Sequence, residues 1–184
     1  TADTLYEVPL LRQKEGLDEI VFRALGRSCP AADMTHWPAM GSDIKNASRE
    51  VTIALVGKYV QLHDAYLSVE ESLFHAGTAC GAVVHIRWVD SETVTEENAA
   101  EVLAGCSGIL VPGGFGDRGI EGMIAAARYA RENNIPYLGI CLGMQIAVIE
   151  FARHVLGWAD AHSTEMAPKT AHPVIDLMPD QVGV

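Results

Sequence analysis

The sequence predicts an α/β domain built on an open, mostly parallel sheet with flanking helices. Four short, largely apolar runs recur after residue 50, at 51–57, 82–90, 108–112 and 136–140, and the first of them is rich in β-branched residues. Such runs are typical of strands that are buried on both faces. Each is followed by a segment with helical spacing, and this alternation indicates parallel strands joined by helical crossovers.

The helices are expected over 64–77, 95–105, 123–134 and 142–157. Asp64 and Thr95 can each accept a hydrogen bond from a backbone amide at the start of a helix. Gly157 ends the last helix because glycine readily adopts the left-handed conformation that follows a helix. A further apolar segment, PVIDLM at 173–178, has the composition of another strand.

The first 50 residues differ from the rest of the chain. Residues 5–27 include an amphipathic helical stretch, with Leu17, Ile20 and Val21 at helical spacing. Residues 28–50 lose this periodicity and contain two prolines and a glycine, which predicts a linker. A domain boundary is therefore expected near residue 50.

Charge and cysteine content exclude several classes of protein. The 184 residues include 13 Lys and Arg against 24 Asp and Glu, a formal net charge of −11. A field of that sign repels nucleic acid and anionic membranes, so neither is an expected partner.

The four cysteines form no C-x-x-C pair, which argues against a disulfide framework or a zinc site and favours a cytoplasmic location. We expect no metal bound by this segment. No apolar run reaches the roughly 20 residues that span a bilayer, and the start of the sequence does not resemble a signal peptide.

Candidate chemistry lies after the fourth predicted strand, where Gly139-Ile140-Cys141-Leu142-Gly143 leads into a helix. G-x-C-x-G is the cysteine counterpart of the G-x-S-x-G nucleophile elbow. The glycines permit a tight turn with the sulfur exposed at its apex, and the helix N-terminus favours a thiolate. The alternative is that Cys141 is a small buried apolar side chain, as many free cysteines are.

The loop after the third predicted strand, Pro112-Gly113-Gly114-Phe115-Gly116, is the second candidate. Ligands bind where the carboxyl ends of parallel strands meet, so this loop should lie beside Cys141. Its backbone amides, together with that of Leu142, could stabilise a developing oxyanion. A tight turn without a ligand is the alternative. No phosphate-binding loop and no dinucleotide-binding glycine motif is present, so the sequence does not support a kinase or a Rossmann dehydrogenase.

Several longer motifs then carry a resemblance. PGGFG, RGIEGMI, PYLGICLGMQ and STEM (163–166), with VGKYVQLHDAYLSV and LYEVPLLRQKEGLDEIV, resemble the class I, triad-type glutamine amidotransferase domain of the CTP synthase family and its junction. The resemblance covers essentially the whole chain. It implies flavodoxin-like layering, with 1–27 as the C-terminal end of a synthetase domain, 28–50 as a linker and 51–184 as an amidotransferase domain that is incomplete at its C-terminus.

The resemblance also implies roles for individual residues. Cys141 would attack the side-chain amide of glutamine, and Gly114 and Leu142 would supply the oxyanion-hole amides. Arg118 would belong to a loop where GTP acts as activator, although it could equally be a solvated charge. Glutamine would be held by Gly114, Leu142, Gly143, Met144, Gln145 and Glu165, with the Glu165 carboxylate pairing with the α-ammonium group.

Further partners follow only from the resemblance. This segment itself would bind no cofactor, whereas a synthetase domain would use ATP, Mg²⁺ and UTP, and the family forms homo-tetramers. The catalytic His-x-Glu pair of the family matches no position here, because none of the seven histidines is followed two residues later by Glu or Asp. We therefore expect the segment alone to be inactive. Two alternatives stay open: another cysteine-elbow glutamine hydrolase, and a non-catalytic truncated module.

Overall fold

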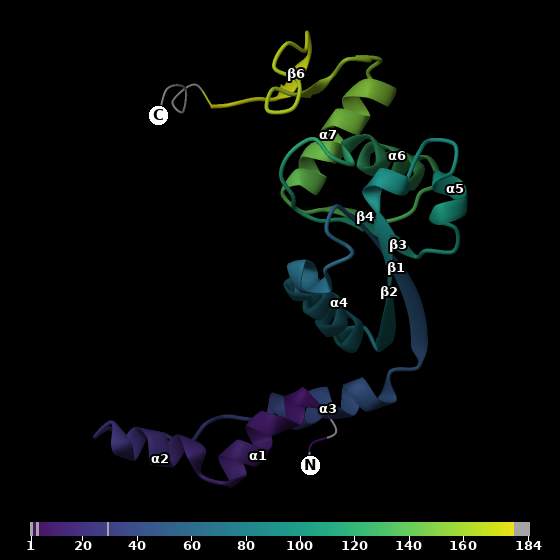
Figure 1. Ribbon diagram of the computed structural model, residues 1–184. Coiled ribbons are helices and arrows are strands. Elements are labelled where there is room, and N and C mark those ends of the chain that lie inside the picture. The colour runs from purple at the N-terminus through teal and green to yellow at the C-terminus, as the bar shows by residue number, and fades with distance from the viewer. Residues whose placement is uncertain (1, 3, 29, 179–184) are drawn as a thin grey trace. The chain divides into compact units, whose positions relative to one another are not determined.

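The computed structural model describes residues 2, 4–28 and 30–178. It divides into two compact units, one formed by residues up to 50 with 74–83, the other by 51–73 with the residues from 84 onward. Figure 1 shows the course of the chain through both units.

The first unit contains η1 (Leu5–Glu7), α1 (Val8–Lys14), α2 (Leu17–Ala24) and α3 (His36–Asn46). Gly16, at φ 75°, separates α1 from α2, so the predicted amphipathic stretch is two helices rather than one. The expected loss of helical periodicity over 28–50 is wrong for the central part of this segment, which is α3. Pro38 lies in the first turn of α3, where a missing N–H breaks no helical hydrogen bond.

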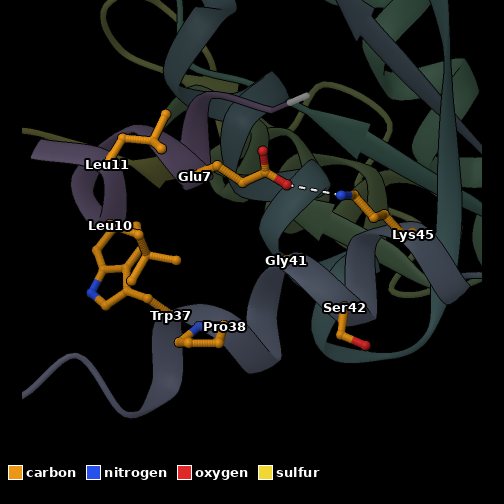
Figure 2. Close-up of a pocket in the computed structure, with 8 residues that line it drawn as sticks. All are labelled: Glu7, Leu10, Leu11, Trp37, Pro38, Gly41, Ser42 and Lys45. Carbon is orange, nitrogen blue, oxygen red and sulfur yellow. Dashed lines mark hydrogen bonds and ion pairs between the residues drawn. The ribbon is translucent and has the colours of Figure 1, made fainter. Parts of the chain in front are cut away.

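A cavity of about 490 Å³ lies between α1 and α3 in this unit (Figure 2). Leu10, Leu11 and Trp37 form much of its apolar lining. The Glu7 carboxylate and the Lys45 ammonium pair at 2.9 Å beside it. Few side chains are deeply covered here, and none of the four helices contains a buried residue among those described.

A four-stranded sheet organises the second unit. Its strands are β1 (Arg49–Gly57), β2 (Ala82–Asp90), β3 (Gly108–Val111) and β4 (Tyr137–Gly139), in the order β2-β1-β3-β4. The pairs β1–β3 and β3–β4 are parallel, with Leu55 opposite Leu110 and Leu110 opposite Leu138. The predicted α/β architecture with a mostly parallel sheet is confirmed (Figure 1).

The connections are helical, as predicted, with shifted boundaries. They comprise η2 (His63–Tyr66), α4 (Leu67–Ala79), η3 (Ser91–Thr93), α5 (Ala99–Val102), α6 (Ile120–Glu132) and α7 (Leu142–His154). Thr95 accepts the predicted hydrogen bond at the start of the turn that leads into α5. Its backbone amide donates to the Asn98 side chain at 2.8 Å, and the Asn98 amide donates back to the Thr95 hydroxyl at 3.3 Å. This reciprocal pair is a capping box, and α5 begins at the next residue, Ala99.

The two faces of the sheet are covered by different elements. Ala54 and Val56 of β1 pack with Ile109 and Val111 of β3 in the cluster that includes α6 and α7. Leu55, which alternates with them, packs on the opposite face with Leu110, Tyr66 and residues of α4. Alternation along buried strands thus gives the sheet an apolar layer on each side.

An ion pair joins α6 to α7. The Arg131 guanidinium donates from Nε and Nη2 to the carboxylate of Glu150, at 2.8–3.1 Å, and Glu150 is only 2% exposed. Paired geometry of this kind satisfies a buried carboxylate and fixes the relative orientation of the two helices.

A second, two-stranded parallel sheet follows α7. It pairs β5 (His162–Ser163) with β6 (Pro173–Ile175). The strand expected over 173–178 is therefore present over its first three residues, while β5 was not predicted. Within the described residues, no helix has the length and apolarity to cross a membrane.

Candidate active site

The turn between β4 and α7 has the geometry of a nucleophile elbow. Cys141 is an exposed non-glycine residue at φ 53°, ψ −105°, a conformation outside the regions that L-residues normally occupy. The two glycines of the motif are required by packing. A β-carbon at Gly139 would overlap the backbone of Gly143, and one at Gly143 would overlap the carbonyl of Val111 in β3. The start of α7 can therefore approach β3 and β4 this closely only with glycine at both positions.

The first turn of α7 leaves one amide available beside the sulfur. The amides of Met144 and Gln145 donate to the Cys141 carbonyl at 3.1 and 3.2 Å, and that of Gly143 donates to the Ile140 carbonyl. Within the described part of the chain, the Leu142 amide donates no hydrogen bond. It is thus free to bind an oxygen atom next to Cys141.

The Gly113–Gly114 loop lies directly against this elbow. A β-carbon at Gly113 would lie 3.6 Å from Cβ of Cys141, and one at Gly114 would lie 3.5 Å from Cδ2 of Leu142. The Gly114 amide likewise has no hydrogen-bond acceptor among the described residues. Gly114 and Leu142, which sequence analysis proposed as oxyanion donors, are therefore neighbours across the sheet edge.

Lys58, at the end of β1, holds the continuation of this loop. Its Nζ donates to the carbonyl of Phe115 at 3.0 Å and to that of Gly116. The residue is only 3% exposed. Burial lowers the pKa of the Lys58 ammonium, as does the neighbouring Arg118, whereas Asp117 and Glu165 oppose the shift. The sequence does not predict this role for Lys58, because its only signal is a lysine directly after a buried strand.

Arg118 is engaged in contacts within the protein. Its Nη2 donates to the carbonyl of Lys58 at 2.7 Å, its Nη1 pairs with Glu92, and its guanidinium carbon lies 5.8 Å from the centre of the Tyr59 ring. The side chain is still about half exposed. The loop of Arg118 is therefore fastened to the turn after β1.

A cavity of about 620 Å³ lies beside the start of α7. Gln145 and Glu165, which sequence analysis assigned to one glutamine site, both line it. Met144 is exposed and Gly143 is buried against β3, and neither lines this cavity. The other residues that line the cavity were not predicted to do so: Ser163, Thr164, Pro168, Ile175, Asp176 and Leu177. Most of these come from β5, β6 and the adjoining turns, which the sequence did not clearly predict.

No hydrogen bond to the Cys141 thiol occurs within the described residues. The late histidines have other contacts. His154 lies beside Glu150, Nδ1 of His172 lies 2.5 Å from Asp160, and Nδ1 of His162 accepts from the Ser163 amide. Burial, and the nearby Arg153, lower the pKa of His162. None of them is in contact with the elbow as a base.

Comparison with known proteins agrees with this geometry. The family model described as glutamine amidotransferase class-I matches residues 61–176. The chain therefore belongs to the class I glutamine amidotransferase family. In its full length it is similar to CTP synthases, at 64% identity to that of Halalkalibacterium halodurans and 55% to that of Bacillus subtilis, both over 183 residues. Each match covers 100% of this chain and 34% of the relative, so the chain spans about a third of the curated relatives' length.

A solved structure resembles the fold. The glutaminase domain of Trypanosoma brucei CTPS with bound acivicin matches with a TM-score of 0.67 and 48% identity. The match covers 71% of this chain and 51% of the other. The class I amidotransferase fold expected from the sequence is thereby confirmed.

Proposed function

We propose that this chain is the glutamine-hydrolysing part of a CTP synthase and that Cys141 is its nucleophile. The observation that carries the proposal is the elbow: an exposed cysteine with a strained backbone, beside two amides, of Gly114 and Leu142, that have no acceptor within the described residues. A nucleophile next to preorganised donors is the arrangement that acyl transfer requires.

In the proposed reaction, the Cys141 thiolate attacks the side-chain carbonyl carbon of glutamine. The carbonyl oxygen becomes an oxyanion, which the amides of Gly114 and Leu142 stabilise. The C–N bond then breaks, the nitrogen takes up a proton and leaves as ammonia, and a glutamyl thioester remains. Water attacks the thioester carbonyl, so that glutamate leaves and the thiolate is restored. The proton transfers require a base, which the resemblance places in a His-x-Glu pair that this sequence does not contain.

The cavity beside α7 is the proposed site for the amino-acid end of glutamine. The Glu165 carboxylate would pair with the α-ammonium group, and the Gln145 amide would bind the α-carboxylate side. Backbone atoms of Gly143 and Met144 would complete the site at the start of α7. A single carboxylate selects an amino acid over a simple amide, because only the amino acid carries the matching cation.

The remaining assignments concern the whole protein. We assign residues 1–27 to the end of a synthetase domain, 28–50 to a linker, and 51–184 to the amidotransferase domain of a cytoplasmic homo-tetramer. ATP with Mg²⁺ and UTP would bind in the part of the relatives' length outside this chain, where ammonia would aminate UTP to CTP. The described residues contain no group of three metal-ligating side chains, and no step above passes through a metal. The Phe115–Glu121 segment, with the half-exposed Arg118, would respond to GTP.

Activity of the full-length protein with two nitrogen sources tests the proposal. Cys141→Ser should abolish CTP formation from glutamine and preserve formation from ammonia, because only glutamine hydrolysis needs the thiol. Cys80→Ser, at another exposed cysteine, is the matched control and should retain both activities. Undiminished glutamine-dependent synthesis in Cys141→Ser would contradict the proposal.

A further inference from the structure

The Tyr66 hydroxyl lies at the turn that follows β1. The side chain is 5% exposed, and its oxygen accepts hydrogen bonds from the backbone amides of Lys58 and Tyr59, both at 3.2 Å. Burial raises the pKa of the phenol, so Tyr66 stays neutral at physiological pH. A β-carbon at Gly57 would lie 2.7 Å from the same oxygen, so glycine is required there for the tyrosine to fit.

These two hydrogen bonds fix the backbone from which the Lys58 side chain departs. An unpaired amide in a buried position is costly, so the turn keeps its shape only while an acceptor is present. The ring itself is held separately, by packing with Leu55, Val60 and Leu110 and by a stacked contact with Trp88 at 6.4 Å. The hydroxyl can therefore be removed while the ring stays in place.

The turn and the Gly113–Gly114 loop are joined by hydrogen bonds in both directions. Lys58 Nζ donates to the carbonyls of Phe115 and Gly116, and Arg118 Nη2 donates back to the Lys58 carbonyl at 2.7 Å. The first of these acceptors directly follows Gly114. A displaced Lys58 would therefore release the loop whose amide faces Cys141.

We propose that Tyr66 is a positioning residue for the glutamine-hydrolysing site. Its hydroxyl orients the turn after β1 so that Lys58 holds the Gly113–Gly114 loop at the distance from Cys141 that the oxyanion requires. The inference rests on the proposed function. In this account Tyr66 contacts neither glutamine nor the cysteine and acts only through Lys58.

Tyr66→Phe and a matched control test this role in the full-length protein. Tyr66→Phe should lower kcat for glutamine hydrolysis about tenfold, because misplacing one oxyanion donor weakens transition-state stabilisation. KM for glutamine should change less than about twofold, because the substrate's amino-acid end binds elsewhere. Tyr129→Phe removes a hydroxyl from a half-buried tyrosine of α6, and it should leave both constants unchanged.

A double-mutant cycle asks whether Tyr66 acts through Lys58. Lys58→Met should also lower kcat at constant KM. The double variant Tyr66→Phe/Lys58→Met should be no slower than Lys58→Met alone, because residues that act in series are non-additive. If the double variant instead loses kcat by the product of the two single losses, the two side chains act independently, and the proposal is overturned.

Other outcomes are also decisive. A Tyr66→Phe enzyme with the kcat of Tyr129→Phe, or one altered only in KM, overturns the inference while leaving the proposed function intact. A wild-type protein that hydrolyses no glutamine refutes the proposed function instead. Should Tyr66→Phe fail to fold, Gly57→Ala displaces the hydroxyl without removing it, and a wild-type kcat in that variant overturns the inference.

Discussion

The backbone conformation of Cys141 makes a prediction that does not depend on catalysis. At φ 53° and ψ −105°, any side chain with a β-carbon is strained, whereas glycine is not. We therefore compare Cys141→Gly with Cys141→Ala. Both variants lack the thiol, and since Cys141 is exposed, neither loses much burial.

The expected difference follows from two opposing terms. Backbone strain of this kind costs of order 1–3 kcal/mol, which glycine relieves and alanine retains. Glycine loses about 0.5–1 kcal/mol more conformational entropy on folding than alanine. Cys141→Gly should therefore be more stable than Cys141→Ala by about 1–2 kcal/mol, or roughly 2–8 °C in Tm for a chain of this size.

Thermal and urea unfolding of the two variants measure this difference. Asn134, the other described non-glycine residue with positive φ, calibrates the comparison, and Asn134→Gly should likewise be more stable than Asn134→Ala. If Cys141→Gly is no more stable than Cys141→Ala while the Asn134 pair behaves as expected, residue 141 has an ordinary backbone. The elbow assignment would then be refuted.

Three further predictions concern other parts of the chain. Gly143→Ala should destabilise the chain by about 3 kcal/mol because the added β-carbon overlaps β3, whereas Gly41→Ala, in open space on a helix, should stabilise it by about 0.5–1 kcal/mol. The urea midpoint should therefore fall in the first variant and rise in the second, and two unchanged midpoints would contradict this. Glu165→Gln should raise KM for glutamine at least tenfold with little change in kcat, whereas Glu101→Gln, at an exposed position of α5, should leave KM unchanged; steady-state kinetics measure both. Stability should fall as pH drops below about 6.5, because the unfolded state takes up a proton that the partly buried His162 of the folded state resists. His162→Gln should reduce the fall of the urea midpoint over this pH range, and an unchanged pH dependence would exclude His162 as its source.

Much of the fold could be predicted from the sequence because its strongest signals are local. The apolar runs at 51–57 and 108–112 became β1 and β3, since a strand buried on both faces needs apolar side chains at every position. The elbow was visible for a similar reason. Gly139 and Gly143 are required by backbone contacts that no other residue permits.

The features that were missed depend on tertiary contacts. Pro38 and Gly41 suggested a linker, but a proline in the first helical turn and a glycine on an open face do not prevent a helix. The short β5 strand has no periodicity to detect. Lys58 resembled an ordinary surface lysine in the sequence, and only the positions of the Phe115 and Gly116 carbonyls explain its burial.

Covalent labelling with a glutamine analogue tests the central claim most directly. The full-length protein is treated with 6-diazo-5-oxo-L-norleucine, with and without excess L-glutamine, and the modified peptide is identified by mass spectrometry. The account predicts one adduct on Cys141 that glutamine suppresses, with no adduct on Cys80, although both thiols are exposed. An adduct on Cys80, equal labelling of both cysteines, or an unlabelled Cys141 in the folded protein would contradict it.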